Sequence, residues 1–143
     1  MVKQKTHATK EVAKREHYFE AVGRRKTAIA RVRIWKGAGE VEISVNGKNL
    51  TQYFPLKKLQ EVVVSPLKAL SEKMKGSAKV AGGGSHAQAE AIRLGISRAL
   101  VLKEATARPR LKALGYLKRD PRMVERKKFG SRKARRPQQW RKR

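Results

Sequence analysis

Positively charged side chains dominate the chemistry open to this chain of 143 residues, since 37 are Lys or Arg and 11 are Asp or Glu. The formal net charge is +26 at pH 7. A charge of this size opposes folding by self-repulsion, so we expect a polyanion to neutralise it. Nucleic acid is favoured over an acidic membrane, because the sequence holds no long basic amphipathic helix with a broad apolar face. No membrane partner is expected.

Residues suited to catalysis are scarce. Asp120 is the only aspartate, so paired carboxylates for acid–base or two-metal chemistry are few. The absence of cysteine excludes disulfides and thiolate catalysis, and it fits a reducing compartment. The three histidines, His7, His17 and His86, lie at no spacing that marks a metal or catalytic site. We therefore expect no catalytic residue, no metal, no cofactor and no enzymatic activity.

A cluster of cations near residue 25 is the first candidate binding site. Arg24, Arg25 and Lys26 lie in a predicted turn, and Arg31 and Arg33 lie on the outward face of the strand that follows. Few acids lie close in the sequence to pair with these five cations. The pattern therefore favours phosphate contact with RNA over a merely solvated surface.

A glycine run before a predicted helix is the second candidate. Gly83 and Gly84 would let a phosphate approach the backbone at the positive end of the helix dipole. A strand-to-helix turn that needs positive φ explains the run equally well. The run is not a nucleoside-triphosphate loop, because no Gly-Lys-Ser/Thr follows it. Arg93, on the polar side of the same helix, is a further candidate ligand of RNA.

The C-terminal segment is the third candidate. Residues 118–143 contain 13 Lys or Arg and two acids. Alone, such a segment buries too little apolar surface to offset its chain entropy, whereas phosphates would let it extend along RNA. Phe129 and Trp140 could stack on bases. The candidate RNA ligands here are Arg126, Lys127, Lys128, Arg132, Lys133, Arg135 and Arg136.

Strand signals fill the first third of the chain. Small and aliphatic residues alternate with outward ones from Ala28 to Trp35, which is the period of a half-buried strand. Before it, Tyr18–Val22 reads as a short strand and Gly23–Lys26 as a turn. After a glycine turn at 36–39, Val41–Val45 alternates again, and Asn46-Gly47 predicts a type I′ turn. We predict an antiparallel meander.

Helical signals follow. Residues 50–70 are predicted to be helical, with Pro55 in the first turn and with Leu56, Leu59 and Val63 on one face. Pro66 either ends this helix or starts another turn. Residues 71–80 show weak alternation that fits a strand leading into the glycine run.

The best-defined helix begins at Ser85. Ser85 is predicted as the N-cap, and Gln88 would complete a capping box. Ile92, Ile96, Ala99 and Leu100 form an apolar stripe, with Arg93, Ser97 and Arg98 on the other side. Gly95 indicates close packing against a sheet. A short element at 109–114 is expected to stop at Gly115. The predicted organisation is a flexible basic arm (1–16), a globular α/β RNA-binding domain (17–117) and a basic extended tail (118–143).

Several motifs resemble those of one known family. Gly23–Val32, Gly82–Leu100, Glu125–Gly130 and Lys133–Arg136, with the closing Lys142-Arg143, are similar to motifs of the ninth protein of the small ribosomal subunit. Tyr53-Phe54-Pro55 is similar to the bacterial type.

This resemblance implies an α+β fold. It would be a two-layer α/β sandwich with a mostly antiparallel sheet, helices on one face, a left-handed βαβ crossover and a long extended C-terminal tail. It also implies assembly on ribosomal RNA in the head of the small subunit, beside other ribosomal proteins, with the cytoplasmic ribosome as the location. The tail would reach the peptidyl site, where Arg141, Lys142 and Arg143 would contact the anticodon stem-loop of the transfer RNA.

Two other functions fit part of the sequence. A general nucleic-acid packaging protein has the same composition, but the ordered motifs favour the ribosome. A phosphate-transferring enzyme would use a glycine loop before a helix, but the carboxylates that such enzymes need to hold Mg²⁺ are missing.

Overall fold

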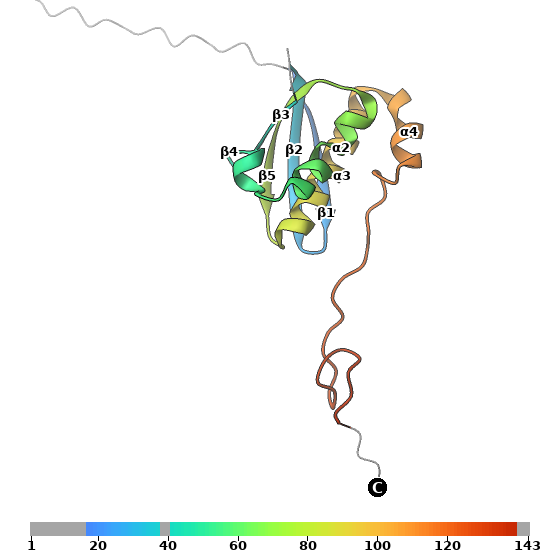
Figure 1. Cartoon of the computed structure of the whole chain (residues 1–143). Helices are drawn as coiled ribbons and strands as arrows, with labels where there is room; N and C mark the ends of the chain where they lie inside the picture. Colours follow the sequence, from blue (N-terminus) through green and yellow to red (C-terminus); the bar gives the residue numbers. More distant parts are fainter. Residues whose placement is uncertain (1–16, 38–40, 140–143) are drawn as a thin grey trace, which may run out of the picture.

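A five-stranded sheet forms the centre of the domain in the computed structural model, which describes residues 17–37 and 41–139. The strand order is β1-β2-β5-β3-β4, and only the β3–β5 pair is parallel. The fold is therefore α+β with a mostly antiparallel sheet, as expected (Figure 1). The strands are β1 (Phe19–Arg25), β2 (Ala28–Lys36), β3 (Glu42–Val45), β4 (Lys48–Asn49) and β5 (Met74–Ala81).

The predicted meander is wrong, because β5 lies between β2 and β3. β5 pairs with β2 along eight positions, from Ile29↔Ala81 to Lys36↔Met74. β3 has four residues and pairs in parallel with β5. In a meander β3 would pair with the second edge of β2, but in this structure β5 pairs with that edge.

Two of the three predicted turns can be compared with the structure, and the third, at 36–39, lies partly outside the described residues. The Asn46-Gly47 turn is confirmed: φ is 49° at Asn46 and 78° at Gly47, and both values are positive as type I′ requires. The earlier turn is shorter than predicted, because β1 continues to Arg25 and pairs with Ala28. Only Lys26 and Thr27 connect β1 to β2, and Lys26 has φ 51°. Arg24 and Arg25 are therefore strand residues.

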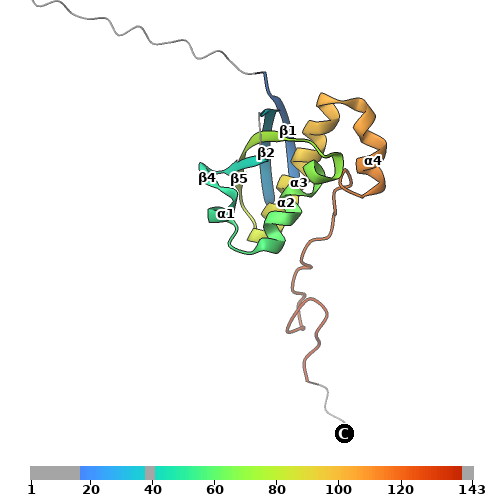
Figure 2. The ribbon, with the colours of Figure 1, turned by 45° about the horizontal axis from the view of Figure 1, so that its top comes forward.

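Helix α3 (Ser85–Lys103) packs on one face of the sheet, against β1 and β2, and α2 (Lys57–Leu70) packs on α3 (Figure 2). The alternation in β2 is confirmed, since Ala28, Ala30, Val32 and Ile34 are all buried. Close packing at Gly95 is confirmed too, because a Cβ there would lie 2.6 Å from Val32 Cγ2. At Gly23, a Cβ would lie 1.9 Å from the carbonyl oxygen of Ala91. The two glycines let α3 approach the sheet backbone.

The segment 50–70 forms two helices instead of one. Helix α1 (Leu50–Tyr53) is separate from α2, and Pro55 lies before α2 instead of in its first turn. Leu56, the N-cap of α2, is 58% exposed, so it does not share the buried face of Leu59 and Val63. Pro66 lies inside α2 and does not end it.

The predicted capping box of α3 is wrong. Gly84 is the N-cap and no side chain caps the helix. The Gln88 amide instead donates to the Gly82 carbonyl and accepts a hydrogen bond from Tyr53 Oη. The apolar stripe is buried as predicted, but Ser97 is fully buried as well, because α3 packs against both the sheet and α2.

After α3 the chain forms η1 (Ala105–Ala107) and α4 (Arg108–Ala113), and Gly115 follows with φ 75°. Tyr116 and Leu117 still pack against the core, Asp120 and Arg122 contact Arg25, and the chain then runs away from the domain (Figure 1). In residues 17–37 and 41–139, no helix is long and apolar enough to cross a membrane. Within the same ranges, no group of three or more His, Cys, Asp or Glu residues could hold a metal ion.

Candidate nucleic-acid interface

The outer face of the sheet carries Arg31 and Arg33, whose side chains are 61% and 44% exposed. Their outward direction is as predicted. The premise that few acids lie near the patch is wrong, because Glu20 of β1 lies 3.4 Å from Arg31 Nε and 2.7 Å from Arg33 Nε. The hydrogen bond to Glu20 raises the pKa of Arg33. Arg33 also lies over the Tyr18 ring, 4.9 Å from its centre.

A further cation on this face was missed by sequence reasoning. Lys79 of β5 is exposed and pairs across the sheet with Arg31. The weak alternation of residues 71–80 gave no sign that β5 lies beside β2. Arg24 is exposed near the end of β1, and Lys26 is exposed in the β1–β2 turn. Neither side chain has an acidic partner in the described part of the chain.

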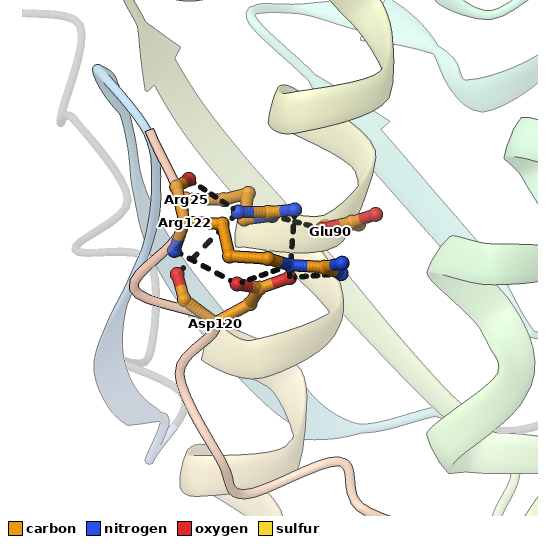
Figure 3. Close-up of polar contacts among 4 residues, drawn as sticks. All are labelled: Arg25, Glu90, Asp120 and Arg122. Carbon is orange, nitrogen blue, oxygen red and sulfur yellow. Dashed lines mark hydrogen bonds and ion pairs between the residues drawn. The ribbon is translucent and has the colours of Figure 1, made fainter. Parts of the chain in front are cut away.

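Arg25 lies apart from the exposed patch. Its side chain is 11% exposed and binds both Glu90 of α3 and Asp120 beyond α4 (Figure 3). The Arg25 Nε lies 2.5 Å from Glu90 Oε2, and Nη2 lies 2.8 Å from Asp120 Oδ2. Nη1 donates to the carbonyl oxygen of Arg122 at 2.9 Å. Arg25 thus joins β1, α3 and the beginning of the tail.

Asp120 is shared between two arginines. Its carboxylate accepts hydrogen bonds from the backbone N–H and the guanidinium of Arg122, and it pairs with Arg25. Hydrogen bonds from Arg122, helped by the charge of Arg25, hold the pKa of Asp120 far below its usual range. We call the set Arg25, Glu90, Asp120 and Arg122 the latch. Sequence reasoning noticed Asp120 only as the single aspartate, although an acid in so basic a segment was itself a signal.

The glycine run has a structural role at Gly83. Its φ is 67°, and a Cβ there would lie 2.9 Å from Ala28 Cβ. A Cβ at Gly84 would meet nothing within 4 Å, so the space beside that residue is open to a ligand. The need for a turn with positive φ thus explains Gly83. Gly84 keeps its predicted role as a residue beside which a phosphate can approach the backbone. Arg93 is half-buried, with its guanidinium 5.3 Å from the centre of the Tyr116 ring.

The tail contains a loop organised by one acid. Glu125 pairs with Lys128 at 2.9 Å and with Arg135 at 2.8 Å. These two partners lower the pKa of Glu125, with Arg135 contributing most. The Arg132 N–H donates to the Arg136 carbonyl, and Ser131 and Pro137 form an isolated β-bridge. The remaining candidate cations are exposed and have no acidic partner among the described residues: Arg126, Lys127, Arg132, Lys133 and Arg136.

Two predicted regions lie outside the described residues. One is the predicted N-terminal arm 1–16, and the other is the end of the tail, with the candidate stacking residue Trp140 and the candidate transfer-RNA ligands Arg141, Lys142 and Arg143.

Exposed cations thus collect on one sheet face and along a basic C-terminal segment, an arrangement typical of small basic proteins that assemble with nucleic acid. Comparison with known proteins narrows this class. The family described as ribosomal protein S9/S16 matches residues 23–143, and the chain belongs to this family.

Individual relatives of the chain have descriptions that agree with this family. "Small ribosomal subunit protein uS9" of Desulfovibrio desulfuricans is 49% identical over 130 residues, which cover 90% of this chain and 98% of that protein. The proteins with the same description from Mycobacterium bovis and Mycobacterium tuberculosis are each 45% identical, covering 90% of this chain and 85% of theirs.

The resemblance stated from the motifs is therefore confirmed. As a member of this family, the chain is a ribosomal protein of the small subunit, with a structural and not an enzymatic role.

Proposed function

We propose that the chain binds small-subunit ribosomal RNA and so helps to build the head of the subunit beside its protein neighbours. The observation that carries this proposal is the set of exposed cations without acidic partners in the described segments. Arg24 and Lys26 belong to this set in the domain, and five of the candidate cations belong to it in the tail. Phosphates are the natural counter-charges for such a set.

Within this proposal the candidate ligands have different roles. Arg31 and Arg33 share Glu20, so they would contact phosphate as a partly neutralised pair. Arg25 is already bound to Glu90 and Asp120, so its role would be to hold the beginning of the tail against the domain. Gly84 and Arg93 would contact RNA at the start of α3 and along it. The loop around Glu125 would present the tail cations to RNA in a partly preformed shape, which reduces the entropy lost on binding.

The tip of the tail is proposed to contact peptidyl-site transfer RNA. Arg141, Lys142 and Arg143 place three cations together, and cations on a chain end can grip a phosphate backbone without reading its sequence. We further propose that the crossover from β3 to β5 is left-handed, and that the chain divides at 16/17 and 117/118 into arm, domain and tail. The fully extended form of the tail belongs to the RNA-bound state.

Salt dependence tests the RNA proposal. If six or more phosphates are neutralised, affinity for bacterial small-subunit ribosomal RNA should fall by about 10³ between roughly 50 and 200 mM salt. A filter-binding series over this range would measure it. Equal affinity for unrelated duplex DNA would instead support packaging.

Sedimentation of a lysate in high salt tests whether the protein is an integral part of the subunit. The protein should remain with the small subunit, and its release to the top of the gradient would contradict an integral role.

Removal of Arg141–Arg143 tests the tip. We expect weaker binding of transfer RNA at the peptidyl site, with subunit assembly unchanged, because the domain and the rest of the tail keep most cations. Reconstituted subunits carrying the full-length or shortened chain would be compared for bound transfer RNA. Loss of assembly on this deletion would show that the tip serves ribosomal RNA instead.

A further inference from the structure

A narrow depression lies where the beginning of the tail crosses the domain beside the latch. Four cations from three separate parts of the chain line it: Arg24 from β1, Arg93 from α3, and Lys118 and Arg119 from the tail. Arg25, Glu90 and Asp120 of the latch also line it. Figure 3 shows how the latch joins β1, α3 and the tail at this place.

The charge of the four cations is not balanced within the domain. Arg24, Lys118 and Arg119 are exposed, and none of the four has an acidic partner in residues 17–37 and 41–139. The two carboxylates that line the depression, Glu90 and Asp120, are already bonded to Arg25. An anion at the mouth of the depression would therefore meet cations that no protein carboxylate neutralises.

The size of the depression limits what this anion can be. Its volume is about 20 Å³, which accommodates one water-sized group and excludes a base. A phosphate oxygen fits, and cations from β1, α3 and the tail all line the space that it would enter. Arginine suits this task because its planar guanidinium can give two hydrogen bonds to one phosphate.

We propose that this depression is a composite site for one phosphate group of the RNA backbone, assembled only while the latch holds the tail against β1 and α3. The proposal rests on the RNA binding proposed above and adds Lys118 and Arg119 to the ligands. Arg25 and Asp120 are positioning residues in it. They bring the four cations together and do not themselves contact RNA.

The charge of Asp120 makes the proposal testable. Asp120→Asn and Glu61→Gln each remove one negative charge, and Glu61 is exposed on α2 and does not line the depression. If charge alone mattered, both variants would bind RNA at least as tightly as the unchanged protein. We expect Glu61→Gln to do so. Asp120→Asn should bind more weakly, with a slope of log K against log salt that is smaller by about one to two.

Methionine methyl NMR of the full-length variants reports on the latch and the fold separately. Met123 is 58% exposed and follows Arg122, whereas Met74 is 1% exposed in the core. In Asp120→Asn the Met123 signal should sharpen as the tail is released, while the Met74 signal stays in place. An unchanged Met123 signal would overturn the latch. A released tail with RNA binding equal to that of Glu61→Gln would overturn the composite site.

A second pair of variants keeps Asp120. Lys118→Ala/Arg119→Ala should lower the salt slope by about two, whereas the matched pair Arg110→Ala/Lys112→Ala on α4 should change it less. Equal slopes for the two pairs would overturn the site while leaving RNA binding by the unchanged protein intact. Failure of the unchanged protein to bind ribosomal RNA in a salt-dependent way would instead refute the proposed function itself.

Discussion

At the scale of single residues, two glycines determine how closely α3 approaches the sheet. A Cβ at Gly95 would press on the Val32 side chain, which has some freedom to move. A Cβ at Gly23 would overlap the backbone carbonyl of Ala91, which has none. We expect Gly95→Ala to lower the free energy of unfolding by about 1–3 kcal/mol, and Gly23→Ala to lower it by more.

Urea unfolding followed by circular dichroism would measure both variants. Gly84→Ala is the matched control, because a Cβ there meets no atom within 4 Å and its φ is −97°. Because Gly84 is the N-cap of α3, where glycine is preferred to alanine, Gly84→Ala should lower the free energy of unfolding by about 1 kcal/mol or less. A larger effect at Gly95 than at Gly23 would mean that the sheet shifts to make room.

The sequence predicted some of these residues and missed others for a physical reason. A glycine inside an apolar helix pattern is unusual, so Gly95 could be recognised locally. Gly23 was assigned to a turn, and its role became visible only with α3 packed on β1. The role of Arg25 depends on Glu90 and Asp120, which lie 65 and 95 residues away in sequence. No local pattern carries that information.

At the scale of elements, a serine allows a proline inside α2. Pro66 has no N–H to donate to the carbonyl of Val62, one turn earlier. Ser65 Oγ donates to that carbonyl instead, at 2.8 Å. We expect Ser65→Ala to lower the free energy of unfolding by about 1 kcal/mol, because it leaves the partly buried carbonyl without this donor.

A double-mutant cycle tests this explanation. In a Pro66→Ala background the new N–H can bond the Val62 carbonyl, so adding Ser65→Ala should then have little effect. Denaturant unfolding of the four proteins gives the coupling energy directly. Equal effects of Ser65→Ala in both backgrounds would show that the serine does not replace the missing donor.

The tail loop should respond to pH through Glu125. Its pKa is lowered chiefly by Arg135 and then by Lys128, so both ion pairs should persist as the pH falls to the usual range of glutamate, about 4.3, and should break below it. Carboxyl ¹³C NMR would follow the titration. Arg135→Gln should raise the midpoint towards the ordinary value more than Lys128→Gln does. The reverse order would contradict the loop geometry.

Elements with local signatures were predictable, whereas their arrangement was not. The alternation of β2 and the Asn46-Gly47 turn depend on neighbouring residues, and both are confirmed. The place of β5 depends on which edge of β2 it pairs with, and that pairing is not encoded in residues 71–80 alone. The capping box failed because Gln88 binds Tyr53 Oη and the Gly82 carbonyl, partners outside its own helix.

At the scale of the whole molecule, the net charge of +26 sets two opposite responses to salt. Repulsion among cations destabilises the compact state, and added salt screens it over distances beyond about 10 Å at 0.1 M. Partly buried pairs such as Arg25–Glu90 and Lys103–Glu72 are screened less. We therefore expect sodium chloride to raise the free energy of unfolding by on the order of 1 kcal/mol, or about 4 °C in Tm.

The same salt should weaken the proposed RNA complex, because bound counterions are no longer released so favourably. Thermal unfolding and RNA binding measured in one salt series would therefore move in opposite directions. Potassium chloride should act like sodium chloride, since screening depends on ionic strength. A fall in Tm with salt would mean that the ion pairs outweigh the repulsion. The internal ion pairs of the domain would then be enough to offset its positive charge. The argument that a polyanion must neutralise this charge would be weaker.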